Sequence, residues 1–216
     1  DTTDPTGSNP APIDLQCFSE IPVPDTSVVT DEDDNCTNDP TVTFISDDIT
    51  DVPCDGQITT VTRTYRIEDC SGNTTDVFQT INISDTTSPT ASNPDNITIE
   101  CFNEMPAPDP LMVTDEADNC DVNGGDLTVD FISDDITSLT CDGGPETITR
   151  TFRVTDCAGN TVDVFQSIIV DDVTPPTILG VGADGEHECN SDPVFSEPTT
   201  EDNCLGTVEL DFEDTI

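Results

Sequence analysis

Ten cysteines recur at nearly constant spacing, and this recurrence constrains the fold more than any other feature of the chain. Corresponding cysteines are 84, 84, 87 and 87 residues apart, and then 88 and 84 residues apart. A fixed period with four cysteines in each copy indicates tandem repeats of one structural unit. We therefore expect repeats at 1–84 and 85–171 and the first half of a third repeat at 172–216. The cysteines are Cys17, Cys36, Cys54, Cys70, Cys101, Cys120, Cys141, Cys157, Cys189 and Cys204.

The segments between the cysteines have the pattern of β-strands. Apolar and polar residues alternate in Thr60–Glu68 and in its counterpart Thr147–Thr155, and β-branched and aromatic residues are frequent there. This period of two is typical of strands, and no stretch of the chain keeps a helical period. A short strand is also expected at Ser27–Thr30. The sequence predicts an all-β chain in which each repeat is a small antiparallel β-sandwich of immunoglobulin-like type.

Composition excludes two classes of partner. The 216 residues include 47 acidic and 4 basic side chains, with a formal net charge of −43. A protein with so few cations cannot neutralise phosphates, so we expect no binding of nucleic acid. No apolar run of the required length exists, so we expect no membrane insertion, and any secretion signal is expected outside this sequence. A low apolar content of 32% is typical of disorder, but the repeated cysteine pattern argues against it.

Four cysteines in a small repeat indicate an oxidising compartment. The nearest cysteines are 15 residues apart, which does not fit a structural zinc site. Alternating strand directions place the first and third cysteines of a repeat at the end near its last residues (the C-pole). The second and fourth lie at the end near its first residues (the N-pole). Because a disulfide needs neighbouring Cα atoms, we expect the bonds Cys17–Cys54, Cys36–Cys70, Cys101–Cys141 and Cys120–Cys157.

The two cysteines of the third repeat are left over by this scheme. We expect the partners of Cys189 and Cys204 to lie beyond the sequence, and a Cys189–Cys204 bond is the alternative.

Acidic and amide side chains from three loops of each repeat are expected to meet at the N-pole. Calcium takes six to eight oxygen ligands, so these loops predict Ca2+ sites at the junctions between repeats. The alternative is that Asp and Asn serve only as turn formers on a solvated surface. The candidate ligands are Asp85, Asp115, Asp118, Asn119, Asp156, Asn160, Asp172, Glu201, Asp202 and Asn203.

Few residues suggest catalysis. The single histidine, His187, has no partner in a repeated Ser/His/Asp or Cys/His set, so we expect no enzyme activity. The four arginines occupy matched positions in two repeats. Arg63 alternates in phase with Tyr65 and Ile67, and we expect it at the edge of the core, paired with an acid.

Four motifs follow one another in each full repeat, at Thr30–Cys36, Thr62–Arg66, Asp69–Asn73 and Asp85–Thr90 in the first. With this order the chain resembles the four-cysteine hyalin-repeat-like (HYR-like) domain. The resemblance implies an immunoglobulin-like fold in long arrays of secreted Bacteroidetes proteins, and it carries over no catalytic residue. The second set is Thr114–Cys120, Thr149–Arg153, Asp156–Asn160 and Asp172–Thr177.

The acidity and the absence of lysine resemble the giant adhesins of gliding bacteria, which leave the cell by type IX secretion. The resemblance implies a non-catalytic, semi-rigid stalk segment at the cell surface, anchored to the outer membrane through other parts of the protein. Expected partners are neighbouring repeats, the secretion and gliding machinery, and an external surface or polysaccharide. The alternatives are an accessory array of a secreted enzyme, or a module that binds carbohydrate or protein. With one Tyr and no Trp, the chain offers few aromatics for a glycan-binding face.

Overall fold

The computed structural model describes residues 1–36, 38–49, 59–120, 127–136, 145–181, 197–204 and 208–211. Within these ranges the regular structure consists of β-strands and short 3-10 helices, without an α-helix. The predicted all-β fold class is confirmed. No helix of the described residues has the length and apolar character needed to cross a membrane.

By their internal contacts, the residues of the chain fall into two compact units. The first unit contains Asp1–Ser92, Val113–Asp130 and Arg153–Val164. This unit therefore combines the first repeat with the parts of the second repeat that lie at the N-pole of the second repeat. The second unit contains Asn93–Met112, Phe131–Phe152 and Phe165–Ile216.

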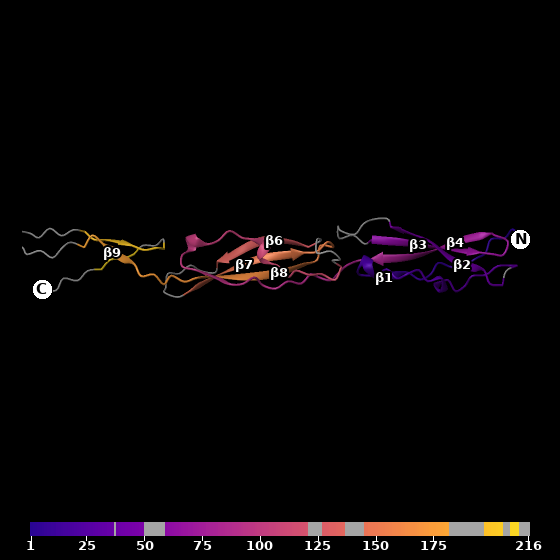
Figure 1. The fold of residues 1–216 in the computed structure, drawn as a ribbon, viewed down its shortest axis with the longest axis horizontal. Coiled ribbons are helices and arrows are strands. Elements are labelled where there is room, and N and C mark those ends of the chain that lie inside the picture. The colour runs from indigo at the N-terminus through magenta and orange to yellow at the C-terminus, as the bar shows by residue number, and fades with distance from the viewer. Residues whose placement is uncertain are drawn as a thin grey trace, which may run out of the picture. The chain divides into compact units, whose positions relative to one another are not determined.

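The first repeat is built on a four-stranded sheet in the order β1-β4-β3-β2, shown in indigo to magenta in Figure 1. Strand β3 pairs antiparallel with both neighbours, but β1 pairs parallel with β4. The prediction of a purely antiparallel repeat is therefore wrong at this edge. Both β1 and β4 run from the N-pole to the C-pole, which brings the end of β1 next to the end of the repeat. The strands are β1 (Ile13–Leu15), β2 (Thr41–Ile49), β3 (Thr59–Glu68) and β4 (Thr74–Ile83).

The layer that covers this sheet contains two 3-10 helices, η1 (Phe18–Glu20) and η2 (Thr26–Val28). Helix η2 replaces the strand predicted at Ser27–Thr30. The carboxylate of Asp25 accepts hydrogen bonds from the backbone N–H and the hydroxyl of Ser27, at 2.9 and 2.7 Å. Such local bonds compete with strand pairing, which explains the wrong prediction.

The core of the first repeat lies between the sheet and this covering layer, which makes the repeat sandwich-like. One cluster of buried apolar residues is near the N-pole and another is near the C-pole. Burial of each large apolar side chain contributes roughly 1.5–3 kcal/mol. The clusters are Val29, Tyr65, Ile67 and Val77, and Val61, Ile81 and Ile83.

The second repeat has the same strand order. Its sheet is β5-β8-β7-β6, and β5 pairs parallel with β8. Antiparallel strands β9 (Thr177–Leu179) and β10 (Thr199–Glu201) belong to the third repeat. The other elements are β5 (Ile97–Ile99), η3 (Phe102–Glu104), η4 (Pro110–Met112), β6 (Thr128–Ile136), β7 (Glu146–Thr155) and β8 (Thr161–Val170).

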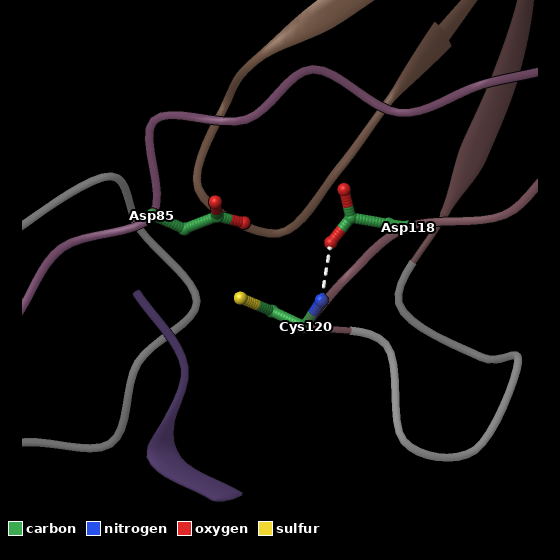
Figure 2. A group of neighbouring side chains, drawn as sticks. All are labelled: Asp85, Asp118 and Cys120. Carbon is green, nitrogen blue, oxygen red and sulfur yellow. Dashed lines mark hydrogen bonds between the residues drawn. The ribbon is translucent and has the colours of Figure 1, made fainter. Parts of the chain in front are cut away.

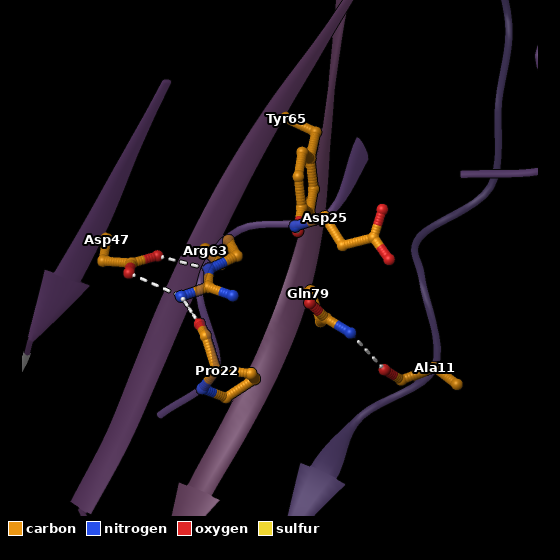
Figure 3. A network of polar contacts seen from close by, with 7 residues as sticks. All are labelled: Ala11, Pro22, Asp25, Asp47, Arg63, Tyr65 and Gln79. Atoms are coloured by element: carbon orange, nitrogen blue, oxygen red, sulfur yellow. Dashed lines mark hydrogen bonds and ion pairs between the residues drawn. The ribbon is translucent and has the colours of Figure 1, made fainter. Parts of the chain in front are cut away.

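A buried ion pair links β2 and β3 to the covering layer. The guanidinium of Arg63, 2% exposed, donates to both carboxylate oxygens of Asp47 at 2.8 and 2.9 Å. It also donates to the carbonyl oxygen of Pro22 at 2.9 Å, as Figure 3 shows. The hydrogen bond with Asp47 raises the pKa of Arg63 despite desolvation. The predicted structural pairing of Arg63 is confirmed, and Arg150 repeats it with Asp134 at 2.8 Å.

Candidate functional site: the junctions between repeats

Two disulfides cross from one repeat to the next. Cys17 is bonded to Cys120 and Cys101 to Cys204, each with a Cα–Cα distance of 5.1 Å. In both cases the first cysteine of one repeat joins the second cysteine of the following repeat, 103 residues further along the chain. The same covalent link therefore occurs at two successive junctions.

These bonds overturn the predicted pairing. Cys17–Cys54, Cys101–Cys141 and Cys120–Cys157 are wrong, because Cys17, Cys101 and Cys120 have partners in other repeats. Cys36–Cys70 is wrong as well, because Cys36 carries an exposed free thiol. Cys157 is itself disulfide-bonded, though not to Cys120. Cys54, Cys141 and Cys189 lie outside the described residues.

The physical reason is that, at both described junctions, the C-pole of one repeat contacts the N-pole of the next. Cys17 follows β1, whose end lies beside the last residues of the repeat. Cys120 lies near the first residues of its repeat, where Thr90 and Ala117 form an antiparallel bridge. The C-pole cysteines Cys17 and Cys101 thus bond to cysteines at the N-pole of the next repeat. For the same reason both expectations for Cys204 are wrong, since its partner is Cys101.

A polar side chain just before the first cysteine holds the linker between repeats. At the first junction the amide oxygen of Gln16 accepts hydrogen bonds from Thr86 N and Thr87 Oγ1, at 3.1 and 3.2 Å. At the second junction the carboxylate of Glu100 accepts from Thr174 Oγ1 at 2.9 Å. Gln16 and Glu100 were not among the predicted site residues. The signal that could have found them is a long polar residue preceding the first cysteine in both repeats.

An asparagine next to the second cysteine contacts the disulfide. Asn119 Nδ2 lies 3.3 Å from Cys17 Sγ and 3.1 Å from Cys120 Sγ. Its counterpart Asn203 donates from Nδ2 to the Glu100 carboxylate at 2.8 Å and lies 3.5 Å from Cys101 Sγ. The amide nitrogen of each asparagine therefore contacts a sulfur of the disulfide between repeats.

Two predicted calcium ligands do meet beside the first disulfide. Figure 2 shows the carboxylates of Asp85 and Asp118 facing each other near the side chain of Cys120. One oxygen of each carboxylate and Cys120 Sγ lie within 4.8 Å of one another. Because this sulfur is in a disulfide, it has no thiolate charge to offer a cation. The cluster thus presents two carboxylates.

The same position is acidic in the other repeats. At the second junction Asp172 and Asp202 lie with Cys204 in an equivalent cluster. In the first repeat the equivalent cluster consists of Asp1, Asp34 and Asp69. The N-pole of every repeat therefore concentrates carboxylates.

Most of the predicted ligands accept hydrogen bonds from groups within their own repeats. Asp115 accepts from Ser92 N at 2.9 Å, and hydrogen bonds from the side chain and then the backbone of Ser92 lower the pKa of Asp115. Asp156 accepts from the backbone and the side chain of Asn160 at 2.7 and 2.9 Å. Further acceptors are Asp85 for Thr87 N, Asp118 for Cys120 N, Asp172 for Thr174 N and Asp202 for Cys204 N.

The remaining candidates also act within the fold. Asn160 Nδ2 donates to the carbonyl oxygen of Asp85 at 3.3 Å, and so links the β7–β8 turn to the linker. Glu201 lies in β10, where its carbonyl oxygen accepts from Thr177 Oγ1 at 3.2 Å. The Asn160 side chain and the Glu201 backbone therefore make these contacts whether or not a cation binds.

The turn between β3 and β4 shows how an acid is used in this way. The carboxylate of Asp69 accepts from Ser71 N, Asn73 N and Asn73 Nδ2 at 2.7–2.8 Å. Burial alone would raise the pKa of Asp69. The hydrogen bonds from Asn73, Ser71 and Gly72 outweigh burial, so the pKa is lowered. Gly72 has φ +87°, a conformation in which other residues are strained.

A comparison with protein families finds a matching model. The model described as an HYR-like domain with 4 cysteines matches residues 5–83 and 89–170. A comparison with curated proteins finds no significant match. The family model covers one full copy on either side of the first junction.

Proposed function

Because the chain belongs to the family of HYR-like domains with four cysteines, we propose that it is a stalk segment of a giant cell-surface adhesin. Domains of this family are non-catalytic repeat modules, and the disulfides fit an extracellular location. The adhesin proposed is of the SprB type, used for attachment and gliding motility and exported by type IX secretion. Its other parts would anchor it to the outer membrane.

The observation that carries this proposal is the repeated junction. Two successive junctions have the same disulfide, the same clamped linker and the same asparagine contact. Such conserved geometry along one chain is typical of arrays in which each repeat contacts only its neighbours. Covalently tied repeats would act as a semi-rigid spacer that holds an adhesive tip away from the cell. Besides neighbouring repeats, the proposed partners are the secretion and gliding machinery and an external surface or polysaccharide.

The high negative charge fits a surface filament. A net charge of −43 keeps neighbouring molecules apart through mutual repulsion. The first alternative, an accessory array of a secreted enzyme, requires a catalytic domain in the flanking sequence. The second, a module that binds carbohydrate or protein, requires binding of a defined ligand by this segment alone.

Antibodies against the 85–171 repeat test the proposal. Intact cells of the source bacterium are labelled without permeabilisation, and the label is followed during gliding. The expected result is a surface label that moves along the cell, and loss of attachment when the repeats are deleted. A label confined to the culture medium, together with an enzymatic domain in the same gene, would favour the accessory array instead.

Calcium at the junctions stays a prediction. It is supported by the carboxylate pairs Asp85–Asp118 and Asp172–Asp202, in a chain with 47 acidic and 4 basic side chains. The predicted effect is a higher melting temperature in CaCl2 than in EGTA. Replacing Asp118 with Asn should abolish the difference at the first junction, and magnesium at equal ionic strength serves as the control. Identical melting in CaCl2 and EGTA would exclude the role.

A further inference from the structure

We infer that the disulfides between repeats form a covalent load path that bypasses the β-sheets. The inference goes beyond the proposed stalk function, because the path follows from the bonds themselves. Its biological use rests on that function.

The path is found by following covalent bonds from Cys17 to Cys204. The direct route along the backbone has 187 steps, since 204 − 17 = 187. The disulfides offer a shorter one, from Cys17 to Cys120, back along the chain to Cys101, and across to Cys204. This route contains only 19 backbone steps, since 120 − 101 = 19.

The long strands all lie outside the short route. Strands β2, β3 and β4 belong to the stretch between Cys17 and Cys101, and β6, β7 and β8 to the stretch between Cys120 and Cys204. The 101–120 segment contains only the 3-10 helices η3 and η4 and the bridge of Ala117 with Thr90. When the ends are pulled apart, this short segment becomes taut while both long stretches remain slack.

The length that tension can release is therefore small. An extended chain spans about 3.5 Å per residue, so the 19 steps reach about 65 Å. Without the two disulfides, the same formula gives about 650 Å for the 187 steps. The two bonds thus reduce the maximum extension between Cys17 and Cys204 about tenfold, even if every sheet unfolds.

Force spectroscopy on single molecules tests the path. The whole oxidised chain is held by its two ends in optical tweezers and pulled at forces that unfold β-sandwiches. The expected extension between Cys17 and Cys204 stays near the short limit, and further disulfides such as that of Cys157 can only shorten it. An oxidised chain that extends several hundred ångströms further without reductant would overturn the inference.

A variant that keeps only Cys17, Cys101, Cys120 and Cys204 gives the sharper test. After peptide mapping of its two bonds, reductant is added under load. Cleavage of either bond opens an 84-step route, which releases 65 steps or about 230 Å, and the second cleavage releases 103 steps or about 360 Å. A single step, or two equal steps, would contradict the overlapping arrangement.

Matched variants of the whole chain distinguish the effect of the load path on extension from an effect on stability. Replacing Cys17 and Cys120 with Ser should lengthen the oxidised molecule at high force, and so should replacing Cys101 and Cys204. The Cys36→Ser variant should behave as the original, because Cys36 is off the path. Lengthening by Cys36→Ser, or none in either double variant, would refute the inference. If the double variants have the expected lengths but cause no adhesion phenotype in cells, only the proposed function is rejected.

Discussion

Replacing Arg63 with methionine tests how strongly a buried charge holds the sheet to its covering layer. Methionine fills most of the volume, but it leaves Asp47 without a partner and removes the donor to the Pro22 carbonyl oxygen. Removing one partner of a buried pair costs about 3–5 kcal/mol. Because the Asp47 side chain is 28% exposed and partly solvated, we expect the free energy of unfolding to fall by about 2–4 kcal/mol.

Arg66 on the same strand provides the matched control. It forms an equally close pair with Asp76, at 2.7 Å, but its side chain is 39% exposed and that of Asp76 is 33% exposed. Surface pairs of this kind contribute about 0–1 kcal/mol. Arg66→Met should therefore have a small effect, although the two arginines are three residues apart and both bind a carboxylate with two nitrogens.

The assay can report on the first repeat alone. Tyr65 is the single tyrosine, the chain has no tryptophan, and the tyrosine ring is fully buried in the core. Its fluorescence during urea unfolding should show a midpoint about 1–2 M lower for Arg63→Met, given a typical dependence of about 1–3 kcal/mol per molar urea. Equal midpoints for the two variants would refute the reasoning that burial sets the strength of these pairs.

Three further predictions concern the junction, the pH dependence and a turn. Fusing a second copy of 85–171 ahead of the chain should bond the first cysteine of that copy to Cys36, and peptide mapping that still finds the Cys36 thiol free would contradict the scheme. Hydrogen bonds lower the pKa of Asp31 and of Asp69 below the ordinary 3.8. The stabilisation that these two carboxylates provide is therefore complete above that pH and is lost as the pH falls below it. The free energy of unfolding, measured by circular dichroism, should decrease in that range, and an unchanged value would contradict the prediction. Gly72→Ala should lower the urea midpoint by the equivalent of about 1–2 kcal/mol, because φ is positive, and an unchanged midpoint would show that the turn relaxes.

The sequence was sufficient to predict the long strands such as β3 (Thr59–Glu68). In β3 the alternation that places Tyr65 and Ile67 in the core also places Arg63 there, and the structure confirms this. A period of two reflects the geometry of a single strand, so it needs no knowledge of distant contacts. The segment Ser27–Thr30 was predicted wrongly, because hydrogen bonds of Asp25 decide its conformation.

The junction could be predicted only in part. The predicted poles of Cys17 and Cys36 agree with the structure, although the strand at Ser27–Thr30 on which the pole of Cys36 was based is not formed. The partners do not follow, because a cysteine at one pole can bond within its repeat or across to the next, and spacing alone does not distinguish the two. The acidic loops have the same ambiguity. The sequence around a carboxylate such as Asp115 does not distinguish a cation ligand from an acceptor for the backbone N–H of Ser92.

The separation of 103 residues within each of these disulfides also sets an order of events. Whenever the chain emerges with its N-terminus first, Cys17 must wait as a thiol until Cys120 of the following repeat has appeared. Each repeat is completed by its successor, so the newest one always presents an unfinished thiol to the surrounding oxidant. In such an array, the disulfide of each repeat therefore forms only after little more than one further repeat has emerged.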